Sequence, residues 1–208
     1  NPYLDTIGLK SEKFLKLSSS QRKSQLFGNK YKNHFVITFA SELSSGLLNP
    51  EEYMKTKDYL LFSPTNIIKR TDVVIFNLID SLKSIKNLPE EILLVLRLHP
   101  KQDIADIAQS QEFQFISKDE DVTEVCLATD IMVGMSSMIM VEAYELGTNT
   151  ISLMPRKSEF SWMHQSHSKS IPTFFCKEDF INNIESTISN FDKINQYKHS
   201  KKRNSVAN

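Results

Sequence analysis

The chain has 208 residues, in which 25 lysines and arginines balance 25 aspartates and glutamates. This balance argues against a protein dedicated to nucleic acid or to a membrane surface, because such proteins normally carry a basic excess. No apolar run approaches the ~20 residues of a membrane span. Cys126 and Cys176 are isolated, which indicates a reducing compartment and buried thiols without a disulfide framework. We therefore expect a cytoplasmic protein, with a peripheral contact at the inner face of the membrane left open.

The polar first 33 residues are expected to form a crossover and an exposed linker, with one short amphipathic stretch around Lys10–Leu17. Because the chain begins at Asn1 without an initiator methionine, we expect it to be part of a longer protein. One domain is predicted over residues 34–192, a length that suffices for a single core. Residues 193–208 are expected to form a basic, flexible tail.

Buried strands alternate with amphipathic helices through this domain. His34–Ala40 and Glu91–Leu98 read as buried strands, and Thr71–Lys86 between them has apolar residues at helical spacing, with Thr71 or Asp72 as its cap. Such alternation predicts a doubly wound, Rossmann-like α/β domain with a parallel sheet. The other predicted elements are a helix near Asp103–Gln109, a strand Phe113–Ile116, a helix Val122–Ala128, a strand Ile171–Cys176 and a helix Lys177–Phe191.

The stretch Asp130–Pro155 carries the strongest pattern. A short apolar strand turns through Gly134, Ser136 and Ser137 into a helix, and Gly147 is expected to end that helix before a second buried strand. Glycine allows close approach of a ligand, the serines add hydroxyls, and the helix presents free N–H groups to an anion. Glu142, on the same helix, is placed to accept hydrogen bonds from ribose hydroxyls. The alternative is a tight turn with a serine N-cap and a solvated glutamate.

Three polar turns follow predicted strands: Ser41–Gly46, His99–Lys101 and Gly134–Ser137. In a parallel sheet they should meet at one edge, where ligands bind. His99 is held before Pro100 in an extended turn and is a candidate phosphate ligand or general acid, against a purely structural loop histidine. Lys101 and Arg97 would add positive charge for a diphosphate, although lysines at strand ends are often only solvated.

Other candidate sites are weaker. His164 and His167 have no nearby carboxylate or cysteine partner, so we expect no metal site and no cofactor. Trp162 is expected to pack rather than to stack on a base. The chain lacks a P-loop, a GxGxxG fingerprint and a Ser-His-Asp order.

The chain resembles the C-terminal, nucleotide-binding half of GT-B-type glycosyltransferases. Asn1–Asp5 is similar to their interdomain crossover, and Arg97–Lys101 to the His-Pro motif of bacterial sialyl- and capsule transferases and of CDP-glycerol glycerophosphotransferases. Gly134–Ala143 resembles their phosphate- and ribose-binding turn and helix. A related Ser…Glu arrangement occurs in UDP-N-acetylglucosamine 2-epimerases.

The resemblance implies one half of a GT-B fold and a role for each matched residue. Ser136 and Ser137 would contact the diphosphate, Glu142 the ribose, and His99 the phosphates or the leaving group. The turn with Ser41 and Glu42 would close over the phosphates, and the base would lie near Ile116 and Lys118. The partners implied are a nucleotide-sugar donor and an N-terminal acceptor domain of the same protein, with direct transfer and no bound metal.

The function expected from the resemblance is therefore donor binding in a cell-surface polysaccharide transferase, inactive as this fragment alone. The turn lacks the double glycine and acidic pair of the epimerases, and Ile139–Glu142 differs from the usual glycerophosphotransferase sequence. An epimerase or a CDP-glycerol glycerophosphotransferase-like domain stays as an alternative. A non-catalytic, flavodoxin-like binding module is the alternative of another class, and nucleotide binding would separate it from both enzymes.

Overall fold

The computed structural model describes residues 12–43, 55, 57–58, 60–64, 69–164 and 169–190. Within them, six strands form one sheet in the order β3-β2-β1-β4-β5-β6, and every neighbouring pair is parallel. The chain winds outward from β1 to β3 and then returns to place β4 beside β1. The predicted doubly wound, Rossmann-like α/β fold is confirmed. The strands are β1 (Phe35–Ala40), β2 (Ile92–Arg97), β3 (Phe115–Ser117), β4 (Ile131–Gly134), β5 (Asn149–Leu153) and β6 (Thr173–Phe174).

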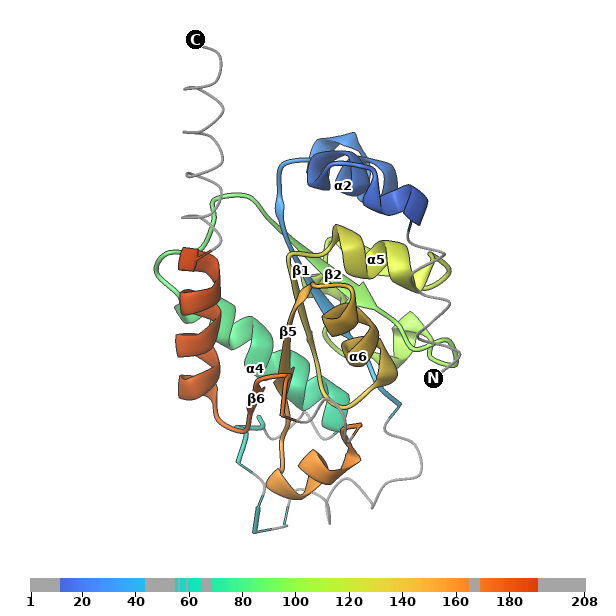
Figure 1. Ribbon diagram of the computed structural model, residues 1–208. Coiled ribbons are helices and arrows are strands. Elements are labelled where there is room, and N and C mark those ends of the chain that lie inside the picture. Colours follow the sequence, from blue (N-terminus) through green and yellow to red (C-terminus); the bar gives the residue numbers. More distant parts are fainter. Residues whose placement is uncertain are drawn as a thin grey trace.

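Helices cover both faces of the sheet (Figure 1). One face carries α4 (Arg70–Ser84) and a helix over residues 177–190, and the other carries α5 (Val122–Ala128) and α6 (Met138–Glu145). The helix α2 (Ser19–Phe27) packs on α5. Short 3₁₀ segments are η1 (Asn29–Tyr31), η2 (Ile104–Asp106), η3 (Ser110–Glu112) and η4 (Lys157–Trp162).

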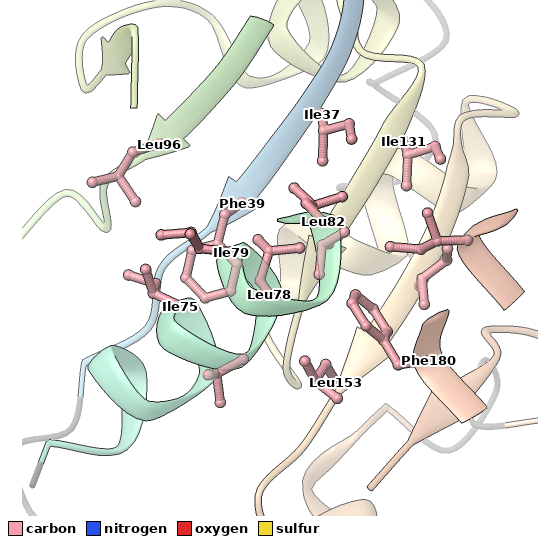
Figure 2. Packing of buried hydrophobic residues seen from close by; sticks show 14 of the residues in the cluster. Ile37, Phe39, Ile75, Leu78, Ile79, Leu82, Leu96, Ile131, Leu153 and Phe180 are labelled. Carbon is pink, nitrogen blue, oxygen red and sulfur yellow. The ribbon is translucent and has the colours of Figure 1, made fainter. Parts of the chain in front are cut away.

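The larger core lies between the sheet and α4. Ile37 and Phe39 of β1 face this side, where Leu78 of α4 and Phe180 of the last helix meet them (Figure 2). Val36, which precedes Ile37, faces α2 and α5 instead. This alternation follows from the two-residue period of a strand. Because both faces are covered, all six residues of β1 are buried, as expected for a central parallel strand.

The segment before β1 is the main difference from the sequence-based prediction. Instead of an exposed linker, it includes α2, which begins with a capping box in which Ser18 and Gln21 exchange side-chain-to-backbone hydrogen bonds. Phe27, the last residue of α2, is buried. Lys23, also in α2, contacts Asp130 Oδ2 through its Nζ at 2.5 Å. The capping box was a readable signal, but a polar helix with two buried residues has little apolar periodicity to detect.

Three local predictions were also wrong. The helix α4 begins one residue before Thr71, and its N-cap position, Lys69, makes no side-chain cap. Thr71 Oγ1 donates to Glu42 O, and Asp72 Oδ1 accepts from Ala108 N, so neither caps the helix. The helix near Asp103–Gln109 is reduced to η2, and β3 starts two residues later than predicted.

The strand predicted over Ile171–Cys176 is reduced to β6, Thr173–Phe174, whereas the remaining strands and helices form where they were predicted. Gly147 follows α6 with a φ of 81°. That left-handed conformation suits glycine and ends the helix. Asn1–Asp5, Ser44–Gly46 and the tail 193–208 lie outside the described residues. The predicted domain boundaries at residues 33 and 192 remain predictions.

Candidate functional site

The switch in winding direction lies between β1 and β4. These strands are hydrogen-bonded neighbours, with Ile37 opposite Ile131 and Phe39 opposite Val133. Connections leave the two strands toward opposite sides, so a crevice opens beyond their carboxyl ends. The loops that follow β1, β2 and β4 surround that crevice.

A cavity of about 610 Å³ occupies this edge of the sheet. The three polar turns meet there, as the parallel arrangement of their strands requires. Six residues predicted for the site line it, together with the buried side chain of Arg97: Ser41, Glu42, His99, Ser136, Ser137 and Glu142.

Ser41 ties the loop after β1 to the loop after β2. Its buried hydroxyl donates to Gln102 Oε1 at 2.7 Å and accepts from His99 N at 3.0 Å. His99 Nδ1 accepts from Lys101 N at 3.2 Å, so Nε2 carries the hydrogen when the ring is neutral. The imidazole is therefore held in one tautomer at the cavity wall, and the Ser41 hydroxyl is committed to holding the loop.

Glu42 lies across the N-terminus of α6. Its carboxylate accepts from the backbone N–H groups of Ser136 and Ser137, the latter at 2.6 Å, and from Ser136 Oγ at 3.1 Å. Ser137 occupies the N-cap position but makes no side-chain cap. The carboxylate thus sits where the partial positive charge of the helix N-terminus favours an anion.

Arg70, at the start of α4, holds the same carboxylate from the other side. Its Nη1 lies 3.0 Å from Glu42 Oε2, and its Nε donates to Glu159 Oε2 at 2.6 Å. Arg156 Nε donates to the second Glu159 oxygen at 2.9 Å, and both guanidinium groups lie against the Trp162 ring. Burial lowers the pKa of Arg70, and Glu42 opposes that shift. Burial and the neighbouring Glu42 carboxylate raise the pKa of Glu159 to about 8 in this network.

The inner wall of the cavity carries Glu142 and Arg97. Glu142 is 4% exposed, so it is not the solvated helix residue of the alternative interpretation. Arg97 Nη1 donates to Ser117 Oγ at 2.8 Å and lies 3.7 Å from Glu120 Oε2. The cavity therefore has a fixed cation from β2 and a buried carboxylate from α6.

Four predicted site residues lie outside the cavity lining. Gly134 ends β4 without a positive φ, and a Cβ there would lie 2.5 Å from Met140 Sδ and 3.3 Å from Ala40 O, so protein atoms fill that space. Lys101 is exposed, and Lys118 Nζ pairs with Asp103 at 2.9 Å. Ile116 packs against the main core.

Two further features bear on the class of site. Among the described residues, no group of three or more His, Cys, Asp or Glu side chains is placed to hold a metal ion. No helix in the described part of the chain is long and apolar enough to cross a membrane.

Fold and cavity together define a doubly wound α/β domain with a ligand crevice at its switch point. A narrower relationship comes from the sequence: residues 47–143 match the family model described as CDP-Glycerol:Poly(glycerophosphate) glycerophosphotransferase. This segment includes the His99 loop, the turn after β4 and Glu142. The resemblance inferred from the motifs is thereby confirmed, and the match covers a little less than half of the chain.

Several solved structures are similar to the chain. Anabaena HepE in complex with UDP-glucose shares 16% identity over 85% of this chain and 45% of that chain, with a TM-score of 0.49. The wall teichoic acid polymerase TagF shares 16% identity over 94% and 42%, with a TM-score of 0.43. The beta Kdo 2,7 transferase of Thermosulfurimonas dismutans KpsC shares 16% over 72% and 45%, with a TM-score of 0.34.

The chain spans less than half the length of each of these three structures. A comparison with curated proteins gives no significant match.

Arg70, which contacts Glu42 beside the cavity, is a residue that the sequence did not reveal. A helix that follows a parallel strand begins at the carboxyl edge of the sheet, so the first turn of α4 had to lie near the predicted site. That topological signal was available, but the burial of the guanidinium depends on Glu42 and Glu159, which are distant in the chain.

Proposed function

We propose that this chain is the donor-binding half of a transferase of cell-surface polysaccharide synthesis, and that it binds a nucleoside diphosphate linked to a sugar or a polyol. The observation that carries the proposal is the meeting of His99, the α6 N-terminus and Glu142 around one cavity at the switch point. The family match over residues 47–143 supports the same class.

The phosphate end of the donor is assigned to the turn between β4 and α6. Ser136 N and Ser137 N point their hydrogens at an anion, as their bonds to Glu42 demonstrate. Backbone donors at a helix N-terminus bind phosphate without any change in their own geometry. His99, with its hydrogen on Nε2, would add a neutral or cationic donor.

The nucleoside end is assigned to the inner wall. Glu142, buried one turn into α6, offers carboxylate oxygens to a pair of ribose hydroxyls, a geometry for which hydrogen bonds to a charged group are strong. The base would then extend toward the end of β3, near Ile116 and Lys118. Glu142 is the residue to which the proposal assigns a direct contact with the nucleoside.

The chemistry supported by this arrangement is stabilisation of the departing nucleotide, which is a nucleoside diphosphate when a sugar is transferred and a nucleoside monophosphate when a polyol phosphate is transferred. Preorganised N–H groups and His99 would lie where negative charge grows as the bond to the transferred group breaks. The acceptor and its base are assigned to a further domain, since His99 is the only imidazole in the described part of these turns. We expect this chain alone to bind weakly, because one wall of an enclosed site leaves it open to water.

Calorimetry with UDP, CDP, GDP and CMP tests the proposal. We expect one of the diphosphates to bind best, and Glu142→Gln to weaken its binding by about 1–3 kcal/mol. Glu145→Gln, an exposed change on the same helix, is the matched control and should have no effect. Equal affinity in a folded Glu142→Gln variant would remove the ribose assignment. If none of the four nucleotides binds, the non-catalytic module is the better account.

The choice of nucleobase separates two donor classes. The family match to CDP-glycerol glycerophosphotransferases favours a CDP-linked polyol, from which a polyol phosphate would be transferred with release of CMP. A preference for CDP over UDP would support that donor, whereas a preference for UDP would favour a sugar donor.

A further inference from the structure

The Glu42 carboxylate already holds the donors that the proposed function assigns to a phosphate. Its two oxygens take the N–H groups of Ser136 and Ser137, the Ser136 hydroxyl and Arg70 Nη1. A carboxylate and a phosphate are both oxyanions with oxygens of similar spacing. Two such groups cannot occupy these donors together.

We propose that Glu42 and a ligand phosphate compete for one oxyanion site, and that Arg70 is the cation that both of them use. The inference rests on the proposed function, since it identifies the occupant of the phosphate site when no nucleotide is bound. It assigns a binding role to Arg70 and makes Glu42 an internal competitor rather than a ligand-binding residue.

The cation of this site is fixed and the carboxylate can exchange. Arg70 is 3% exposed and is held by Glu159, which is fully buried and is also bonded to Arg156. Glu42 is held through its backbone, because Thr71 Oγ1 donates to its carbonyl oxygen at 2.7 Å. Its side chain is 12% exposed, so it borders solvent. Opening of the site under this proposal therefore requires only a rotation of the Glu42 side chain.

The Ser137 hydroxyl supplies an independent observation. Its Oγ is buried and, among the described residues, has no hydrogen-bond partner. Buried polar atoms without partners are uncommon and need an explanation. A carboxylate has two oxygens and both are already used, whereas a phosphate brings a third. A phosphate in the place of the Glu42 carboxylate would give the Ser137 hydroxyl an acceptor.

Occupation by the Glu42 carboxylate explains how the phosphate site stays stable when no ligand is bound. Without an anion, Arg70 Nη1 and the N–H groups of Ser136 and Ser137 would be buried or half-buried without acceptors, which is costly. Glu42 provides those acceptors until a ligand replaces it. The apparent affinity for the ligand then falls by the fraction of time that the site is open.

The test compares inorganic pyrophosphate and UDP binding to the wild-type chain and to Glu42→Gln and Glu42→Asp variants, by calorimetry. The glutamine lacks the charge, and the aspartate keeps the charge but is too short to reach the α6 N-terminus. We expect both variants to bind pyrophosphate about tenfold tighter or more, because the competitor is removed. Adding Arg70→Lys to Glu42→Gln should abolish the gain.

Glu90→Gln, an exposed change at the opposite edge of the sheet, is the charge-matched control and should leave affinity unchanged. Tighter binding by Glu42→Gln alone, or an equal gain in Glu90→Gln, would indicate general repulsion and overturn the proposal. Unchanged or weaker binding in both Glu42 variants would overturn it too, while leaving the proposed function intact. If no variant binds either ligand, both fail. Thermal unfolding checks the folding of each variant. If Glu42→Gln does not fold, the pyrophosphate affinity of Glu42→Asp tests the proposal instead.

Discussion

Arg70 Nε lies 2.6 Å from Glu159 Oε2, and this contact joins the first turn of α4 to the η4 segment after β5. The same guanidinium reaches Glu42, in the loop after β1. One buried arginine therefore connects three segments that are far apart in the chain. The arrangement of the carboxyl edge of the sheet depends on it.

Replacing this arginine should destabilise the fold. Arg70→Met keeps much of the side-chain volume but leaves the Glu42 and Glu159 carboxylates without their shared cation. We expect the free energy of unfolding to fall by about 3–5 kcal/mol, as when one partner of a buried ion pair is removed. Urea denaturation measures it.

The control for Arg70→Met lies on the same helix. Lys83 is exposed and pairs with Glu112 at 3.5 Å, so Lys83→Met should change stability by about 1 kcal/mol or less. If Arg70→Met and Lys83→Met lower the free energy of unfolding by similar amounts, the buried network around Arg70 does not stabilise the fold.

His99 should matter for phosphate and not for the nucleoside. His99→Ala removes the Nε2 donor while Ser41 still accepts from the backbone at residue 99. We expect diphosphate binding to weaken by about 1–3 kcal/mol and nucleoside binding to stay unchanged. Calorimetry with UDP and uridine, or CDP and cytidine, measures the difference. His34→Ala, before β1 at the opposite edge, is the control, and equal losses for nucleoside and diphosphate would reduce His99 to a structural role.

Much of this fold was readable from the sequence because its strands are buried on both faces. Runs such as Phe35–Ala40 and Ile92–Arg97 are apolar except for Thr38 and Arg97, and Val73–Leu82 repeats apolar residues at helical spacing. The parallel order then places the turns after β1, β2 and β4 together. The predicted meeting of Ser41, His99 and Ser136 at one edge follows from topology alone.

The ends of the helices and strands and the polar side-chain contacts could not be predicted from the sequence. Whether Thr71 caps α4 or bonds Glu42 depends on a loop that lies beside it only in the folded chain. The charge partners of Arg70 are 28 and 89 residues away. Such pairs have no local pattern, so the sequence gives their residue types but not their pairing.

Gly134 should act through packing. A Cβ at this position would meet Met140 Sδ at 2.5 Å, so Gly134→Ala forces the Met140 side chain to move in a tight core. We expect a loss of about 1–3 kcal/mol in unfolding free energy, the usual cost of overpacking. In a Met140→Ala background the same change should cost clearly less. Additive losses would show that Met140 is not the group that excludes a side chain at residue 134.

The two cysteines should differ in reactivity. Cys126 is fully buried in α5, and burial raises the pKa of its thiol, so little thiolate is present near neutral pH. Cys176 is half-buried, and its Sγ donates to Asp179 Oδ2 at 3.1 Å. We expect iodoacetamide to label Cys176 in the native protein and Cys126 only after denaturation. Mass spectrometry of a Cys176→Ser variant checks this, and rapid labelling of that variant in its folded form would contradict the burial of Cys126.

The central claim is that the turn between β4 and α6 binds the phosphates of a nucleotide. Its most direct test is the backbone amide NMR signals of Ser136 and Ser137 during titration with UDP or CDP, with uridine and cytidine for comparison. We predict that one diphosphate shifts these two signals most, that the nucleosides leave them nearly unchanged, and that the Glu90 and Glu91 signals at the opposite edge do not move. Unchanged Ser136 and Ser137 signals with every diphosphate, or equal shifts with nucleosides, would contradict the claim.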